Sequence, residues 1–244
     1  MIDLDTLEAT LDCDSTEALH AATKKFVNQL GYEHFIYGVQ VNTSLTRPYQ
    51  FVFSGYPNAW RDRYIEAGYQ GIDPTVTHCI KQRRVIPIVW EERYFNSQSQ
   101  ASARMMGEAM DFGLRGGVTL SIQGGHGEAA MLSLATPTNP NEARSDIVGT
   151  LGQAQLLACY LHEAIQRIVL SKQTTPLRRP TLTAREKECL TWAAEGKTAW
   201  EIANIVHIAE RTAVFHLHNA TRKMGVSTRQ HAVARAVTLG LVTP

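Results

Sequence analysis

The sequence predicts a two-domain protein in which an α+β N-terminal domain precedes an all-α C-terminal domain. Within residues 1–171, helical patterns are interspersed with about five short runs rich in β-branched and aromatic residues. Residues 182–244 contain several helix-start signals and read as a compact four-helix unit. The segment between them, residues 172–181, is polar and contains prolines, which is typical of a linker.

Composition places the chain among ordinary globular proteins. It has 244 residues, of which 44% are hydrophobic and 19% charged, enough for two domains with sizeable cores. It shows no apolar run of membrane-spanning length and no basic N-terminal targeting segment. The four cysteines are scattered without paired spacing (Cys13, Cys79, Cys159, Cys189). We therefore expect a cytoplasmic protein with reduced thiols, no metal site and no membrane partner.

The N-terminal domain is expected to be an antiparallel sheet between helices, an α/β/α sandwich. Ser15 is the expected cap of a first helix that ends at Gly31. Further helices are expected to begin at Pro57 and Pro74 and to cover residues 100–112 and 141–171. The expected strands are residues 34–41, 50–54 and 85–90, followed by a hairpin formed by 117–123 and 129–136.

The C-terminal domain carries three sequences of the capping-box type, in which a hydroxyl residue precedes Glu or Gln by three positions. They start at Thr183, Thr198 and Ser227. Between the last two lies a predicted helix over 209–224, whose apolar residues follow helical spacing on one face (Ala213, Leu217, Ala220, Met224). A short helix, a turn and a second helix with a basic outer face form the pattern that enters a DNA major groove.

Charge distribution favours DNA over the simpler interpretation of a solvated helix face. Residues 176–244 contain ten Lys or Arg against five Asp or Glu, whereas residues 1–175 contain fourteen against eighteen. A basic module follows an acidic one, and phosphate attraction depends on such local charge. The predicted DNA-binding residues are Lys197, Arg211, Thr212, Val214, His218, Arg222 and Lys223.

The segment LTAREKECLTWAAEGKTAWEIANIV, followed by FHLHNATRKMGV, resembles the DNA-binding domain of LuxR-type transcription regulators. Glu186, Leu190 and Gly196 occupy signature positions of that family. The chain departs from it at Ala209, where a Ser cap is frequent, and at Ala213, where Val is usual. The missing cap is expected to cost about 1 kcal/mol, so the recognition helix should fray at its start in the absence of DNA.

Several residues of the first domain have the chemistry of a small-ligand pocket. Tyr56 and Trp60 are four apart, and each joins a hydrogen-bonding group to a large apolar ring. Asp73 could accept from a ligand N–H or simply cap the helix beginning at Pro74, and spacing alone favours neither. Ser133 could face a pocket or bond the backbone. Trp90 reads as a packing wall.

The first domain also resembles the autoinducer-binding domain of quorum-sensing LuxR-type regulators, through Trp60, Tyr64, Asp73, Pro74, Trp90 and Gly113. The segment DPTVTHC and Arg61 are most similar to the LasR-like branch, which recognises 3-oxo acyl-homoserine lactones. The resemblance implies that Trp60 donates to the lactone carbonyl and that Asp73 accepts from the ligand amide. It further implies that Tyr56 and Ser133 form hydrogen bonds to the amide-side carbonyl, with Thr75 in support. Arg61 would contact a 3-oxo group through water. Tyr64 and Trp90 would form walls around the lactone ring.

The expected function is that of a quorum-sensing transcription regulator rather than an enzyme. An acyl-homoserine lactone would act as regulatory ligand, without a cofactor, and the dimer would bind inverted-repeat promoter DNA, with RNA polymerase as a candidate partner. One alternative is a LuxR-type regulator that responds to a non-lactone signal or to none. A phosphorylated response regulator would need an acidic pair on a parallel sheet, and a lactone hydrolase would need a nucleophile elbow or clustered histidines; neither pattern is present.

Overall fold

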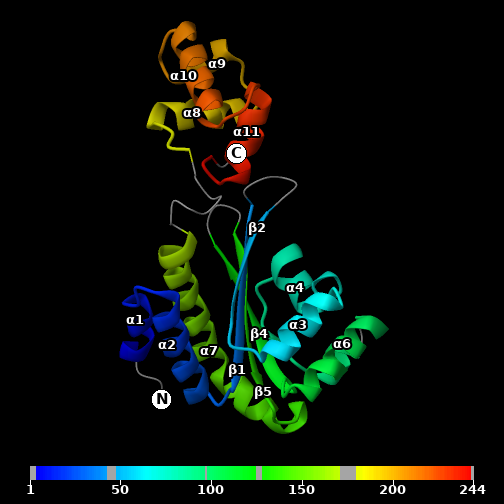
Figure 1. The fold of residues 1–244 in the computed structure, drawn as a ribbon. Helices are drawn as coiled ribbons and strands as arrows, with labels where there is room; N and C mark the ends of the chain where they lie inside the picture. Colours follow the sequence, from blue (N-terminus) through cyan, green and yellow to red (C-terminus); the bar gives the residue numbers. More distant parts are fainter. Residues whose placement is uncertain (1–3, 43–47, 97, 125–127, 171–179, 243–244) are drawn as a thin grey trace. The chain divides into compact units, whose positions relative to one another are not determined.

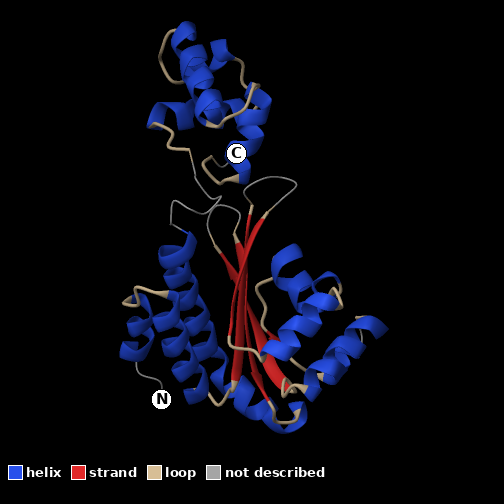
Figure 2. Ribbon diagram, in the orientation of Figure 1, coloured by secondary structure: helices blue, strands red, loops and turns tan. Residues whose placement is uncertain are grey.

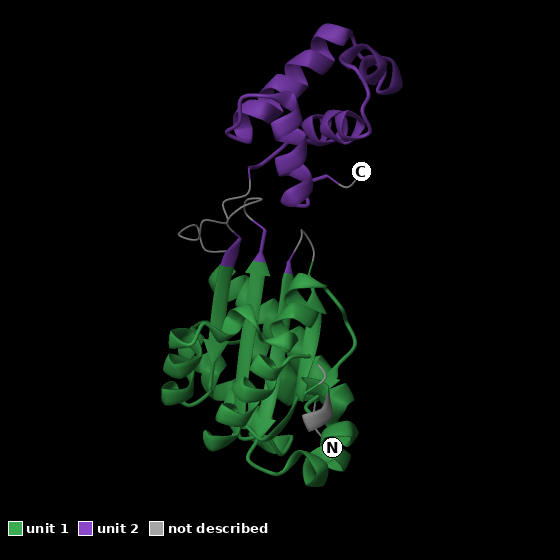
Figure 3. Cartoon of the chain, turned by 90° about the vertical axis from the view of Figure 1, so that its right-hand side faces the viewer, with its two compact units in different colours: residues 1–40, 50–124, 129–175 green, residues 41–49, 125–128, 176–244 purple. Residues whose placement is uncertain are grey.

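A computed structural model describes residues 4–42, 48–96, 98–124, 128–170 and 180–242. The chain forms two compact units, one comprising residues 1–40, 50–124 and 129–175 and the other residues 41–49, 125–128 and 176–244 (Figure 3). Of the predicted linker, residues 172–179 lie outside the described residues, as do residues 125–127 of the predicted hairpin turn.

The first unit is built on a five-stranded sheet of order β2-β1-β5-β4-β3. The strands are β1 His34–Val41, β2 Tyr49–Ser54, β3 Ile88–Val89, β4 Gly116–Gln123 and β5 Ala129–Thr136. The β1/β5, β4/β5 and β3/β4 pairs are antiparallel. The predicted strands 34–41 and 50–54 and the two strands of the hairpin are confirmed. The strand predicted over 85–90 is reduced to Ile88–Val89 at the sheet edge, and Pro87, which has no N–H to donate to a ladder, lies just before it.

Helices cover both faces of this sheet, as the predicted α/β/α sandwich requires (Figures 1 and 2). One face carries α1 Leu4–Leu11, α2 Thr16–Gln29 and α7 Pro140–Ile165. The other carries α3 Asn58–Glu66, α4 Pro74–Val76 and α6 Gln100–Asp111. Shorter helical segments are the 3₁₀ turn Tyr69–Gly71, α5 Glu92–Asn96 and the π-helical turns Thr77–Lys81 and Gln166–Leu170.

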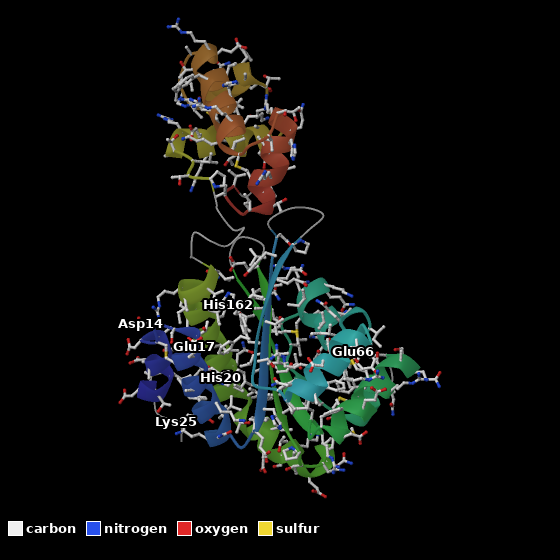
Figure 4. The ribbon with its side chains drawn as sticks, viewed as in Figure 1. Asp14, Glu17, His20, Lys25, Glu66 and His162 are labelled. Carbon is white, nitrogen blue, oxygen red and sulfur yellow. The ribbon has the colours of Figure 1, made fainter. Side chains whose placement is uncertain are left out.

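Strand β1 shows how the two faces differ. Its side chains alternate between half-buried and fully buried along the whole strand. Tyr37, on the buried face, has its hydroxyl 2.6 Å from Nδ1 of His162, which lies on α7 on the side of α1 and α2 (Figure 4). Ile36 and Gly38 point to the opposite face, beneath α3 and α4, where a cavity is found.

Helix α2 begins as predicted, because the Ser15 hydroxyl accepts a hydrogen bond from the N–H of Ala18 at 3.1 Å. Helix α1 was not predicted. With only eight residues it is too short to be stable alone, but it packs on α2 and α7. Within the described residues, no helix combines the length and the apolar character needed to cross a membrane.

The second unit contains the four expected helices, α8 Ala184–Ala194, α9 Ala199–Ile205, α10 Glu210–Lys223 and α11 Arg229–Thr238. The predicted apolar stripe of α10 is confirmed: Ala213, Leu217, Ala220 and Met224 are all buried. They pack with residues of the other three helices, among them Leu190, Ile202 and Ala236, in a single core.

Two of the three predicted capping boxes are present, at Thr183 with Glu186 and at Thr198 with Glu201, each with both reciprocal hydrogen bonds. The third is wrong in register. Helix α11 is capped by Thr228, whose hydroxyl accepts from the N–H of His231 at 3.2 Å, and Ser227 lies one residue before the cap. Two adjacent hydroxyl residues satisfy the same local rule, so sequence spacing did not separate them.

Candidate ligand cavity and DNA-binding helix

A cavity of about 380 Å³ lies on the α3/α4/α6 face of the sheet. Its volume is within the range of sites that enclose small organic ligands. Strands β1, β2 and β5 form its floor, and helices α3, α4 and α6 supply much of its remaining wall. All eight predicted ligand-binding residues line it: Tyr56, Trp60, Arg61, Tyr64, Asp73, Thr75, Trp90 and Ser133.

Asp73 is both a helix cap and a cavity residue, so the two interpretations left open by the sequence are compatible. Its Oδ1 accepts from the backbone N–H and the hydroxyl of Thr75 at 2.8 and 2.7 Å, and its Oδ2 accepts from the Tyr64 hydroxyl at 2.9 Å. A carboxylate has about four lone-pair sites. These three bonds therefore leave one site on Oδ2 for a further donor.

Trp60 is held by a cluster of aromatic rings. It is 4% exposed, and its ring centroid lies 6.0 Å from Tyr64, 6.0 Å from Tyr69 and 5.6 Å from Phe112. Such edge-to-face and tilted contacts fix the plane of a ring. The indole of Trp60 consequently meets the cavity in one orientation.

A hydrogen-bonded row crosses the sheet beneath the cavity. The indole N–H of Trp90 donates to Oγ1 of Thr119 at 2.9 Å, and Thr119 Oγ1 lies 2.9 Å from Oγ of Ser133, its register partner. Gly117 lets Trp90 approach, since a Cβ there would lie 2.9 Å from the indole and 2.4 Å from Leu134 O. Trp90 thus lines the cavity with its N–H already bonded to Thr119. Thr119 was missed, because a Thr within a strand carries no functional signal of its own.

The Tyr56 hydroxyl is buried and has no hydrogen-bond partner among the described residues. Burial raises the pKa of this phenol, the charge of Asp73 raises it further, and the nearby Ser133 hydroxyl lowers it without forming a hydrogen bond of normal geometry. A neutral O–H buried without a partner is costly. It is therefore suited to receive a ligand acceptor from the cavity.

The outer face of α10 presents Arg211, Val214, His218 and Arg222, all exposed. Their spacing of three, four and four residues places them along one side of the helix. Thr212 and Lys197 are half-buried. The cap position Ala209 makes no side-chain hydrogen bond, as its missing hydroxyl requires.

Lys223 differs from the other predicted DNA-binding residues. Its Nζ donates to Oε2 of Glu186 at 2.7 Å, and Glu186 is only 3% exposed. Burial raises the pKa of this carboxyl, but the hydrogen bonds from Lys223 and from the Thr183 backbone outweigh it, so that the pKa lies below the ordinary 4.5. An ammonium group has three donor hydrogens, so this ion pair leaves Lys223 able to meet a phosphate as well.

The fold and the two sites define a ligand-binding α/β/α domain followed by a helix-turn-helix domain. Residues 15–165 match the family model "Autoinducer binding domain" and residues 180–236 match "Bacterial regulatory proteins, luxR family". The chain therefore belongs to the LuxR-type quorum-sensing transcriptional regulators, which are not enzymes.

Similar proteins cover nearly the whole chain. The transcriptional activator AnoR of Acinetobacter nosocomialis is 35% identical over 98% of both chains, and VanR of Vibrio anguillarum is 36% identical over 89% of this chain and 88% of that one. Among solved structures, SdiA of Escherichia coli in complex with octanoyl-rac-glycerol has a TM-score of 0.75 and 27% identity, covering 99% of this chain and 98% of that one.

Proposed function

We propose that the chain is a ligand-gated transcription regulator whose first domain binds an N-acyl-homoserine lactone. Two observations carry the proposal. The buried Tyr56 hydroxyl, beside Ser133, has no hydrogen-bond partner in the part of the chain that the structure describes, and the bonds described for Asp73 leave one of its lone pairs open. A ligand amide supplies a hydrogen-bond partner for each residue, because its C=O accepts from the Tyr56 hydroxyl and its N–H donates to the Asp73 carboxylate. Trp60 donates to the lactone carbonyl, and Arg61 meets a 3-oxo oxygen through water.

The direct test is extraction. The full chain is produced in cells supplied with a panel of acyl-homoserine lactones and of monoacylglycerols, then purified, denatured and examined by mass spectrometry. We expect an intact lactone in stoichiometric amount. Recovery of an acylglycerol instead would contradict the lactone proposal, and recovery of opened lactone would indicate turnover.

The acylglycerol is included because SdiA has been solved with octanoyl-rac-glycerol. That ligand shares an acyl chain with the lactones but lacks their amide N–H. The open lone pair of Asp73 requires a donor, and a hydroxyl of a glycerol also supplies one. An amide matches both Tyr56 and Asp73 through two adjacent atoms, so we favour the lactone.

We further propose that the ligand-bound protein is a homodimer that binds an inverted repeat. Two copies of α10 would enter successive major grooves, with Val214 and His218 reading bases and Arg211 and Arg222 contacting phosphates. Lys197, Thr212 and Lys223 complete the contact surface, and RNA polymerase is the candidate partner at the promoter. The basic charge of residues 176–244 supports the phosphate contacts. Footprinting on a promoter with altered half-site spacing tests the repeat.

The proposed domain limits are 1–171 for the ligand-binding domain and 182–244 for the DNA-binding domain. The capping box at Thr183 supports the second start, because it opens α8. Limited proteolysis should cut within residues 172–181 and leave two resistant fragments.

A further inference from the structure

Three glutamine side chains form a hydrogen-bonded chain in the cavity wall. Nε2 of Gln70 donates to Oε1 of Gln50 at 3.1 Å, and Nε2 of Gln50 donates to Oε1 of Gln40 at 3.1 Å. We call these three residues the glutamine chain. They come from the 3₁₀ turn after α3, the edge strand β2 and strand β1, and all three line the cavity.

The glutamine chain lies away from the polar groups assigned to the ligand head. On strand β5, Ser133 is the register partner of Ile36, whereas Gln40 pairs with Ala129. Four residues of strand correspond to about 13 Å at ~3.3 Å per residue. The cavity floor therefore has one polar row at Ser133 and a second at Gln40.

Apolar groups occupy the space between these rows. Gly38 lies midway on β1 and faces the cavity, with Met131 opposite it on β5. The remaining apolar lining includes Val52, Val76 and Ile80. An alkyl tail anchored at Asp73 can follow this surface until it meets the amides of the glutamine chain.

Contact between a tail and these amides has a cost. Gln50 and Gln70 are exposed and Gln40 is half-buried, so water can reach their remaining N–H and C=O groups while the cavity is empty. An alkyl tail that covers them removes this water and offers no hydrogen bond in return. Each amide group left without a partner weakens binding by about tenfold.

We propose that the glutamine chain is the end wall that sets the preferred tail length of the ligand, so that Gln40, Gln50 and Gln70 are specificity-determining residues. This inference rests on the proposed lactone function and deepens it. Tails that end on the apolar surface bind best, and longer unsubstituted tails are penalised because they cover the amides.

The test uses purified full-length protein and a series of saturated N-acyl-L-homoserine lactones from butanoyl to tetradecanoyl. Dissociation constants are measured for the wild type, Gln40→Leu and Gln50→Leu. Gln100→Leu is the matched control, because Gln100 is an exposed residue at the start of α6 outside the cavity lining. The profile is compared within each variant, so a uniform loss of stability does not imitate a shift.

For the wild type we expect affinity to rise with tail length and then to fall by about tenfold beyond the preferred length. Gln40→Leu and Gln50→Leu should move the maximum to longer tails, and Gln100→Leu should leave it in place. A wild-type profile that rises up to tetradecanoyl, or the same maximum in wild type and both cavity variants, overturns the end wall while lactone binding stands. Binding of no lactone at all overturns the proposed ligand class and the end wall with it.

Discussion

Nζ of Lys223, at the end of α10, lies 2.7 Å from Oε2 of Glu186, at the start of α8. The carboxylate is nearly inaccessible, with its side chain 4% exposed, whereas that of Lys223 is 35% exposed. The pair therefore ties the recognition helix to the capping box of α8. Removal of the lysine would leave a buried charge without its ionic partner.

Lys223→Ala should lower the stability of the DNA-binding domain by about 2 kcal/mol, less than for a fully buried pair, because only the Glu186 carboxylate is buried and it loses its ionic partner. Arg222→Ala, one residue earlier and exposed, should leave stability unchanged while weakening binding to all DNA. Urea unfolding and salt-dependent DNA titration of both variants provide the measurement. Equal unfolding midpoints would show that the ion pair has no structural role.

Tyr56→Phe should act in opposite directions with and without ligand. It removes a buried hydroxyl that has no partner in the described part of the chain, so the free protein should lose no stability and gain up to about 1 kcal/mol. Lactone affinity should fall by about fivefold or more. The control is Tyr37→Phe, whose hydroxyl bonds His162 on the other face of the sheet. This control should lower stability and spare lactone affinity.

Asp73→Asn should preserve the fold and weaken lactone binding by ~1.5–3 kcal/mol, because it replaces a charge-assisted hydrogen bond by a neutral one. Asparagine remains a good cap, so the bond from the Thr75 N–H can persist. Competition binding gives the affinity, and thermal unfolding without ligand gives the stability. An unchanged lactone affinity would show that Asp73 acts only as the N-cap of α4.

Trp60→Phe should raise the half-maximal lactone concentration in a reporter assay by about tenfold, because it deletes the indole donor but keeps the aromatic packing. Trp90→Phe is the comparison, since the Trp90 N–H already bonds Thr119 within the protein. Trp90→Phe should lower the stability of the protein more than it shifts the lactone concentration for half-maximal reporter response. A response curve for Trp60→Phe that coincides with the wild type would argue against the donor role.

His218→Ala should change the preference at one base pair of each half-site by roughly 1–3 kcal/mol, because base contacts discriminate and phosphate contacts do not. The variant is titrated against the promoter site and a scrambled duplex at several salt concentrations. An equal loss of affinity for both duplexes would show that His218 contacts the DNA backbone and does not read a base.

Local rules predicted much of the fold. The Ser15 cap and the capping boxes at Thr183 and Thr198 depend only on residues within one helical turn, and all three are present. The error at Ser227 arose where two adjacent hydroxyls compete for the same cap. Helix α1 was missed because eight residues gain their stability from α2 and α7 rather than from their own sequence.

The sequence by itself determined the order of most elements, the apolar face of α10 and eight of the residues that line the cavity. The tertiary structure decided what those residues do. The carboxylate of Asp73 accepts hydrogen bonds from Tyr64 and Thr75 and keeps one lone pair for a further donor. Lys223 forms an ion pair with Glu186, which is 37 residues away in the sequence. The glutamine chain joins Gln40, Gln50 and Gln70 from three separate elements. Hydrogen bonds and ion pairs act over a few ångströms in space, so only the folded chain shows which distant residues meet.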